Sequence, residues 1–143
     1  MERYSFKYLS VAASESRMLD EIASLLERLG LDKQMKHKVM LVVSEAFTNA
    51  YLHGNRENPE ATIKIDLTLN ETEITVDISD EGKEREGLKN ILNKKPATLL
   101  GENGRGIDLI RHYADLVRFE RGEKGGLRVV TTFFRENKDE VKI

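Results

Sequence analysis

The segment LVVSEAFTNAYLHG, residues 41–54, decides how this chain is interpreted. It continues an amphipathic helix that begins after Asp32, because apolar residues recur there at helical spacing. The apolar face consists of Met35, Val39, Val42, Val43, Ala46 and Ala50. Three polar side chains, Glu45, Asn49 and His53, follow one another at i, i+4 spacing. At about 100° per residue, Glu45 falls at the rim of the apolar face, Asn49 further in and His53 near its middle.

These polar residues have two kinds of explanation. A carboxylate and an amide beside a core face cost free energy unless something there uses them. In a structural explanation, Glu45 is a solvated rim charge, Asn49 is a buried amide bonded to backbone, and His53 is a cation at the helix C-terminus. A functional explanation requires glycine-rich segments further along the chain to meet this helix.

Composition limits the class of protein. The chain has 143 residues, 39% hydrophobic and 34% charged, which suits one domain with its own core. Its 23 Lys and Arg are balanced by 25 Asp and Glu, so the net charge of −2 does not favour direct nucleic-acid binding. No apolar run approaches the roughly 18 residues of a membrane span, and MERYSFKYLS has no apolar signal-peptide core. Because cysteine is absent, we expect no disulfide and no Cys-ligated metal. A cytoplasmic protein without membrane contact is the default expectation.

The N-terminal part of the chain predicts one strand and two helices. Aromatic residues alternate with small or polar ones over residues 4–11 (YSFKYLSV), as on one face of a strand. Ser14 is the predicted N-cap of the first helix, and Gly30 ends that helix. Asp32 then caps the second helix, which ends at Gly54.

Two hairpins and a third helix are predicted downstream. Apolar residues alternate over 61–69 and 73–79, which indicates an antiparallel hairpin with one buried side. A helix is expected from Gly104 to Ala114, followed by a second hairpin built from 115–121 and 127–134.

Two segments do not fit this regular pattern. Residues 82–103 lose periodicity, although a short helix near 87–93 is compatible with their sequence, and we expect them to form a lid. The charged tail, about 136–143, is expected to fray. The whole chain, 1–143, is therefore one α/β (α+β) domain. We expect a two-layer sandwich, with a mixed, mostly antiparallel sheet of about five strands and helices on one face.

Three segments carry residues suited to nucleotide chemistry. The first is the helix with Glu45 and Asn49, whose amide oxygen is a suitable ligand for Mg²⁺. The second is Asp80-x-Gly82 at a strand end, where a carboxylate can accept an exocyclic amine and glycine admits a flat ring. The third is GENGRG, residues 101–106, whose backbone N–H groups open a helix toward phosphate. Each segment alone can also be explained as an ordinary turn or as the boundary of a helix.

The order of these segments resembles the GHKL (histidine kinase-like) ATPase superfamily. Glu45-x-x-x-Asn49-Ala50 with His53-Gly54 resembles its N box, Asp80-x-Gly82 its first glycine box, and residues 101–106 its second, with the lid between them. Within the superfamily, the size of the chain and the string EAFTNAYLHGN look most like the bacterial anti-sigma factor serine/threonine protein kinases. The resemblance runs from the first strand to the closing hairpin and implies the Bergerat ATPase fold.

The resemblance implies ATP and Mg²⁺ as cofactors and assigns roles around the phosphates. Asn49 would coordinate Mg²⁺, and Glu45 would be the general base for a serine hydroxyl of a partner protein. The amides of Gly104 and Gly106 would hold phosphate oxygens. Arg105 between them would neutralise charge on the transferred phosphoryl group, or is a surface arginine at a lid hinge.

The remaining binding positions follow from the same motifs. Asp80 would bind the adenine amino group, and Gly82 would allow close approach of the ring. His53 and Gly101 are expected to bind the cofactor as parts of their motifs. The family often has Gly-Thr where Gly126-Leu127 stands here, so Thr131 is offered as the substitute for the threonine beside the adenine.

One further departure concerns the first glycine box. Family members commonly have DxGxG, whereas this chain continues Gly82-Lys83-Glu84, which indicates a different start of the lid.

The resemblance implies a function and partners. The protein would sequester a sigma factor and use ATP to phosphorylate a serine of an anti-anti-sigma protein, and it would form a homodimer. The alternatives are a regulatory module that binds nucleotide without phosphotransfer and an interaction domain that binds no nucleotide. The presence of both Glu45 and Asn49 favours the kinase, because a binding module needs no base.

Overall fold

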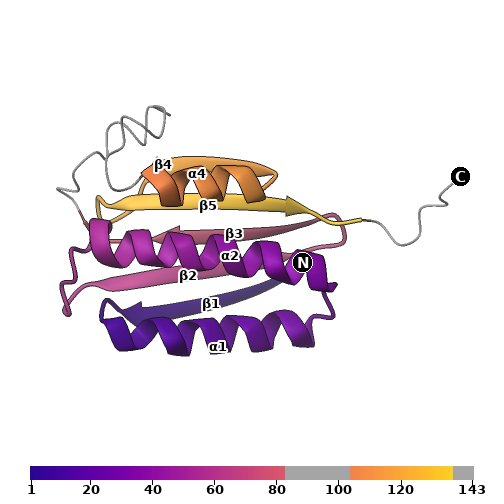
Figure 1. Ribbon diagram of the computed structural model, residues 1–143, viewed down its shortest axis with the longest axis horizontal. Helices are drawn as coiled ribbons and strands as arrows, with labels where there is room; N and C mark the ends of the chain where they lie inside the picture. The colour runs from indigo at the N-terminus through magenta and orange to yellow at the C-terminus, as the bar shows by residue number, and fades with distance from the viewer. Residues whose placement is uncertain (83–103, 137–143) are drawn as a thin grey trace, which may run out of the picture.

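Helices cover one face of a five-stranded sheet in the computed structural model, which describes residues 1–82 and 104–136 (Figure 1). The strands are β1 (Glu2–Leu9), β2 (Thr62–Leu69), β3 (Glu73–Ser79), β4 (Leu116–Arg121) and β5 (Leu127–Phe134). The helices are α1 (Ala12–Arg28), α2 (Lys33–Asn49) and α4 (Gly104–Tyr113), and the π-helical turn η1 (Ala50–Gly54) continues α2. The predicted two-layer α/β sandwich is confirmed.

The strands lie in the order β1-β2-β3-β5-β4, and each neighbouring pair is antiparallel. Both predicted hairpins, β2–β3 and β4–β5, are present. The parallel neighbours of a mixed sheet are not found among the described strands. The reason is the route of the chain, which passes through α4 to β4 at the sheet edge and then turns back, so that β5 enters between β4 and β3.

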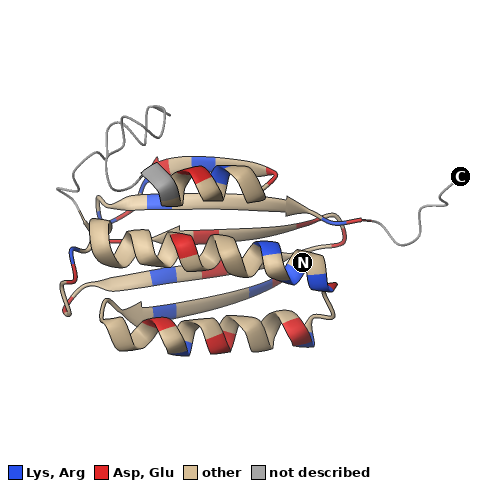
Figure 2. Ribbon diagram, viewed as in Figure 1, with Lys and Arg blue, Asp and Glu red and all other residues tan. Residues whose placement is uncertain are grey.

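Alternation along the strands produces one apolar and one polar face of the sheet. Ile65 pairs with Ile78, and Ile78 with Val129, and all three are buried beneath the helices. The opposite face carries ion pairs across neighbouring strands, among them Arg128 Nε to Asp77 Oδ2 at 2.7 Å. Figure 2 shows charged positions recurring along the strands and on the outward sides of the helices.

Helix α2 lies between α1 and α4 and provides the middle of the helical layer (Figure 1). Most positions of the predicted apolar face are buried: Val39, Val42, Val43 and Ala46 of α2 and Ala50 of η1 are at most 3% exposed. Met35 is only partly buried. The helix begins at Lys33 because the Asp32 carboxylate accepts the N–H of Met35 at 2.8 Å, which confirms the predicted N-cap.

The predicted cap of α1 is wrong. The helix begins at Ala12 with Val11 at the N-cap position, and no side chain caps it. Ser14 lies inside the first turn, where its N–H donates to Val11 O at 3.0 Å. The chain turns into α1 directly after β1, since Ser10 N–H is still bonded to Ala61 O beside β2. The helix therefore begins earlier than side-chain preference alone suggested.

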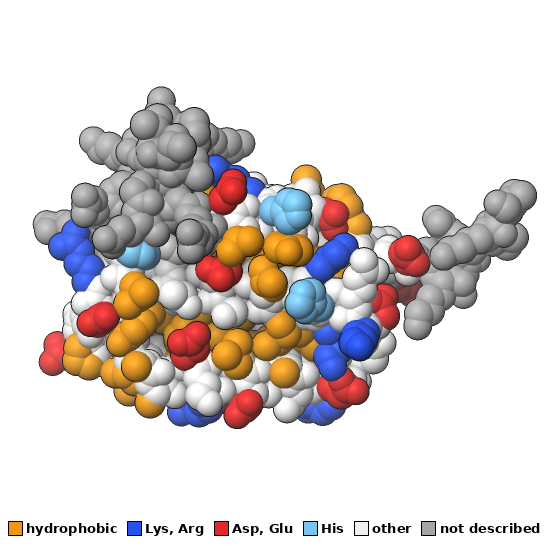
Figure 3. Space-filling model, viewed as in Figure 1, with side chains coloured by type: hydrophobic (Ala, Val, Ile, Leu, Met, Phe, Trp, Pro, Cys, Tyr) orange, Lys and Arg blue, Asp and Glu red, His pale blue; other side chains and the backbone are white. Residues whose placement is uncertain are grey.

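Figure 3 shows the helix-covered face, on which hydrophobic side chains remain visible between charged ones. Partly buried hydrophobic residues that pack against the core include Leu19, Leu29, Met35 and Met40. Within residues 1–82 and 104–136, no helix is both long enough and apolar enough to cross a membrane. The predicted lid, its short helix near 87–93 and most of the predicted tail lie outside the described residues.

The Asp32 cap leads to a stability prediction. Replacing Asp32 by alanine should lower the free energy of unfolding by about 1 kcal/mol, because the bond to Met35 N–H is lost. Chemical denaturation measures this change. Asp20→Ala, at an exposed position within α1, is the control and should change stability by less than about 0.5 kcal/mol. Equal effects of the two substitutions would contradict the capping role.

Candidate nucleotide-binding site

The carboxylate of Glu45 and the amide of Asn49, both on α2, lie beside the first turn of α4. A Cβ atom added at Gly106 would lie 2.6 Å from Asn49 Nδ2 and 3.3 Å from Glu45 Oε2. Asn49 is only 5% exposed and Glu45 is half-buried. The structure thus brings Glu45, Asn49 and Gly106 together, and only a glycine leaves the Asn49 amide where it is.

The contact with Gly106 sets the chemical character of this part of the site. The first backbone N–H groups of a helix have no partner within the helix and favour anions. Helix α4 begins at Gly104, so this end lies beside the polar side chains of α2. Gly101 and the side chain of Arg105 lie outside the described part of the chain.

A second cluster surrounds Asp80, directly after β3. The Asp80 side chain is 4% exposed, and its Oδ1 accepts the N–H groups of Gly82 and Leu127, each at 3.0 Å. Asp80 N–H donates in turn to Leu127 O at 3.0 Å. Asp80 is therefore held between the end of α2 and the start of β5, in one orientation.

Glycines line this second cluster. A Cβ atom at Gly54 would lie 2.1 Å from Asp80 Oδ2, and one at Gly126 would lie 2.2 Å from Asp80 Oδ1. At Gly82 it would lie 1.7 Å from the carbonyl oxygen of Gly54. No side chain fits at these three positions, so glycine is required by the close approach of η1, β3 and β5.

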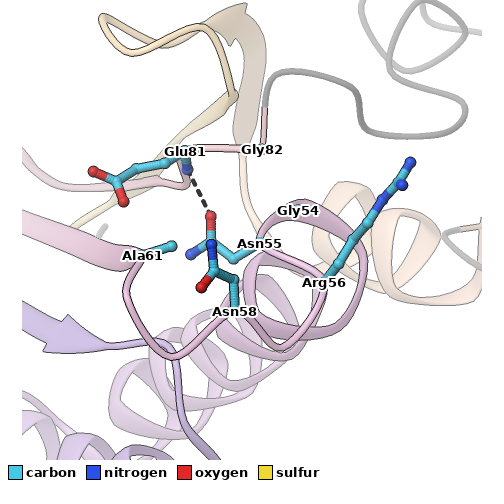
Figure 4. A pocket seen from close by; sticks show the side chains of 7 residues that line it. All are labelled: Gly54, Asn55, Arg56, Asn58, Ala61, Glu81 and Gly82. Carbon is cyan, nitrogen blue, oxygen red and sulfur yellow. Dashed lines mark hydrogen bonds between the residues drawn. The ribbon is translucent and has the colours of Figure 1, made fainter.

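A pocket of about 220 Å³ adjoins this glycine cluster (Figure 4). It is lined by Gly54, Asn55, Arg56, Asn58, Ala61, Glu81 and Gly82. Asn55 is 6% exposed, donates from Nδ2 to Thr62 O at 3.0 Å and accepts Glu81 N–H at Oδ1 at 2.8 Å. Asn55 is not among the residues predicted from the sequence, because an asparagine after a glycine is typical of an ordinary turn.

Glu81 links three parts of the site. Its Oε2 accepts Thr62 N–H at 2.7 Å, and its Oε1 accepts a hydrogen bond from Lys124 Nζ at 2.8 Å. Burial acts to raise the pKa of Glu81, but the bonds from Lys124 and Thr62 outweigh it and hold the pKa below the usual 4.5. The carboxylate thus ties the β4–β5 turn to the start of β2.

His53 and Thr131 lie in different surroundings. His53 is half-buried in the last turn of η1, next to Gly54 of the glycine cluster. Thr131 is fully buried, and its hydroxyl donates to Val76 O at 2.9 Å inside the sheet. It lies four residues along β5 from Leu127, or about 13 Å at the usual strand rise. The structure therefore places Thr131 inside the sheet and not beside Asp80, and a role for it at the adenine stays a prediction.

Residues 1–82 and 104–136 contain no group of three or more His, Cys, Asp or Glu side chains arranged to hold a metal ion. A magnesium ion held mainly by phosphate and water needs only one or two protein oxygens. The buried amide of Asn49 beside the start of α4 fits that requirement.

Taken together, a two-layer α/β sandwich with an amide, a carboxylate and glycine-lined turns at one end defines a class of nucleotide-binding domains. The family described as histidine kinase-like ATPase domain matches residues 10–133, and the chain belongs to this family. The sequence resemblance to the ATPase superfamily is confirmed.

Several relatives of this chain are anti-sigma F factors. The chain is 26% identical over 130 residues to the anti-sigma F factor of Clostridium novyi (strain NT), with 90% of this chain and 91% of that protein covered. It is 29% identical over 135 residues to the anti-sigma F factor of Oceanobacillus iheyensis, with 90% and 89% covered. The resemblance to the anti-sigma factor kinases is thereby confirmed.

A solved structure shares the fold. The crystal structure of the RsbU and RsbW domains of Rv1364c from Mycobacterium tuberculosis matches with a TM-score of 0.65 at 13% identity. The match covers 99% of this chain but 35% of that longer chain.

The glycine cluster predicts a difference between two neighbouring glycines. Gly126→Ala should lower the free energy of unfolding by about 1–3 kcal/mol, because the new Cβ would lie 2.2 Å from Asp80 Oδ1 and 2.4 Å from Asp80 O. Gly122→Ala, in the same turn, is the matched control: its nearest atom would be at 3.4 Å, so stability should not fall by more than about 0.5 kcal/mol. Thermal or chemical denaturation measures both, and a tolerated Gly126→Ala would contradict the close approach.

Glu81 predicts a pH dependence of stability. Its pKa is depressed in the folded protein, so its contribution is present above the unfolded pKa of about 4.3 and is lost as the pH falls through the folded pKa. The Tm difference between wild type and Glu81→Gln should therefore be largest at pH 5–7 (a range above about 4.3) and shrink below it. Glu60→Gln, at an exposed position nearby, controls for the loss of one charge. A Tm difference that does not change with pH would contradict the ion pair with Lys124.

Proposed function

We propose that this protein is an anti-sigma factor that binds a sigma factor and uses ATP and Mg²⁺ to phosphorylate a serine of an anti-anti-sigma protein. The single observation that carries the kinase proposal is the packing of Glu45 and Asn49 against Gly106 in the first turn of α4. Membership in the ATPase family supports ATP binding, and the names of the relatives support the anti-sigma role.

The adenine end of the proposed site is built on Asp80. Its buried carboxylate would accept the exocyclic amino group of adenine, while guanine would present a carbonyl oxygen and be repelled. The glycine cluster supports this role, because Gly54, Gly82 and Gly126 keep side chains away from the carboxylate. His53, beside Gly54, is proposed to contribute to the same end of the site.

The phosphate end is built on Asn49 and the start of α4. Asn49 Oδ1 would serve as a ligand of Mg²⁺, which would neutralise charge on the phosphates. The N–H groups of Gly104 and Gly106 are proposed to hold phosphate oxygens at the positive end of the helix. Gly101 and Arg105 remain proposals from sequence, for phosphate binding and for stabilising the transferred group.

Phosphoryl transfer requires a base near the metal-binding amide. Glu45 lies one helical turn before Asn49, at a half-buried position. As the serine oxygen of the partner forms its bond to the γ-phosphorus, its proton would pass to the Glu45 carboxylate and the bond to ADP would break. This carboxylate is what favours a kinase over a regulatory module that binds nucleotide without transferring phosphate.

The partners are proposed on the same grounds. A sigma factor and its antagonist are suggested by the relatives' names and by the sequence resemblance. A homodimer is proposed from the resemblance, and its oligomeric state can be measured by sedimentation.

Nucleotide binding is tested by thermal stability. ATP with Mg²⁺ at 100 times its Kd should add about 2.7 kcal/mol, which raises the Tm by several degrees. GTP should have little effect, because guanine lacks the amino group at the position that Asp80 would recognise. Asp80→Asn should reduce the ATP shift. No shift at millimolar ATP would overturn the proposal.

Two substitutions distinguish the role of the proposed base from that of the proposed metal ligand. Glu45→Gln should bind ATP as wild type does but lose about 10²–10⁴-fold in transfer to the partner serine, because the proton acceptor is missing. Asn49→Ala should weaken Mg²⁺-dependent ATP binding itself. Binding is measured by calorimetry and transfer with labelled ATP. Parallel loss of binding and transfer in Glu45→Gln would speak against a general base.

A further inference from the structure

We infer that Asn55 is a positioning residue that sets the adenine selectivity of the site by holding the Asp80 segment against the end of α2. The inference rests on the proposed nucleotide site and concerns a residue that does not itself touch the base. It is carried by the two hydrogen bonds of the buried Asn55 amide and by the close contact of Gly54 with Asp80 and Gly82.

The π-helical turn brings Asn55 to its position. After α2 the hydrogen-bonded ring widens, and Asn55 N–H donates to Ala50 O at 2.7 Å, five residues earlier. Such turns are rare and frequently occur at functional sites. Here the widened turn leaves Gly54 facing Asp80 and Asn55 between the start of β2 and the end of β3.

The Asn55 amide joins these two strand ends. Nδ2 donates to Thr62 O at 3.0 Å. Oδ1 accepts Glu81 N–H at 2.8 Å (Figure 4). Rotating the amide would set its NH₂ against an N–H and its oxygen against a carbonyl, so only one orientation satisfies both partners. An aspartate lacks the donor, an alanine lacks both groups, and an unpaired buried partner costs more than the bond contributes.

Glu81 completes the connection on the same residue of β2. Thr62 donates its N–H to Glu81 Oε2 at 2.7 Å and offers its carbonyl oxygen to Asn55. The N–H of Thr62 is thus bonded to Glu81, which follows Asp80. The carbonyl oxygen of Thr62 is bonded to Asn55, which follows Gly54. The distance between η1 and the end of β3 is set by this arrangement.

That distance determines where the second carboxylate oxygen of Asp80 lies. Oδ1 is bonded to the N–H groups of Gly82 and Leu127, so Oδ2 lies on the side of Gly54. A shift of Gly54 relative to Glu81 would move Oδ2 with respect to a bound base. Because discrimination between an amino group and a carbonyl oxygen depends on that oxygen, loss of the Asn55 bonds should weaken selectivity more than phosphate binding.

The test compares Asn55→Ala, Asn55→Asp and Asn58→Ala in the full chain. Asn58 is the matched control, because it lines the same pocket but is exposed, and its side chain accepts a hydrogen bond from Glu60 N–H within its own loop. Affinities for Mg²⁺ complexes of ATP, GTP and tripolyphosphate, a probe without a base, are measured by calorimetry. Thermal denaturation without ligand confirms folding.

Asn55→Ala should bind ATP about tenfold more weakly, the size expected for one misplaced hydrogen bond, and should lose most of its preference over GTP. Tripolyphosphate affinity should not change, and Asn58→Ala should behave as wild type. Asn55→Asp keeps the size of the side chain and the acceptor for Glu81 N–H but not the donor. It should show the same loss of selectivity, and it provides the test if Asn55→Ala does not fold.

Three results would overturn the inference. A folded Asn55 variant with the wild-type ratio of ATP to GTP affinity would remove the positioning role and leave the proposed function intact. Equal loss of ATP and tripolyphosphate binding would assign Asn55 to general stability of the site. Wild-type protein that binds neither nucleotide would overturn both the inference and the proposed function.

Discussion

The close approach of the end of α2 to the end of β3 is the constraint on which the rest of the site depends. Gly54 contacts the Asp80 carboxylate, and Gly82 lies against the Gly54 carbonyl, at distances that admit no side chain. Gly126, at the start of β5, closes the third side of Asp80. A buried carboxylate is costly unless it is bonded, and the N–H groups of Gly82 and Leu127 provide that compensation.

Helix α2 connects this constraint to the rest of the molecule. Its apolar side packs into the core between α1 and α4, while Glu45 and Asn49 meet Gly106 at its C-terminal half. The polar residues of the site are therefore placed by the same helix that holds the two layers together. A change in how α2 packs against the sheet would alter both the phosphate end and the Asp80 end of the site.

Much of the secondary structure could be predicted because its causes are local. Alternation predicted both hairpins, and Asp32 was recognised as a cap because its side chain bonds to Met35, three residues away. Ser14 was misassigned because a bond beside β2 holds the chain just before α1. The neighbours of Thr131 could not be predicted, because strand register pairs it with Val76 and a single strand does not reveal its register.

The sequence by itself determined the fold class, the α2 motif and the order of the glycine-rich segments, since these follow from spacing along the chain. Only the tertiary structure decided which glycines touch which polar groups, and that the amide of Asn55 joins Thr62 to Glu81. The physical reason is that these contacts join residues from separate elements, whose distances are set by packing of the layers and by strand register.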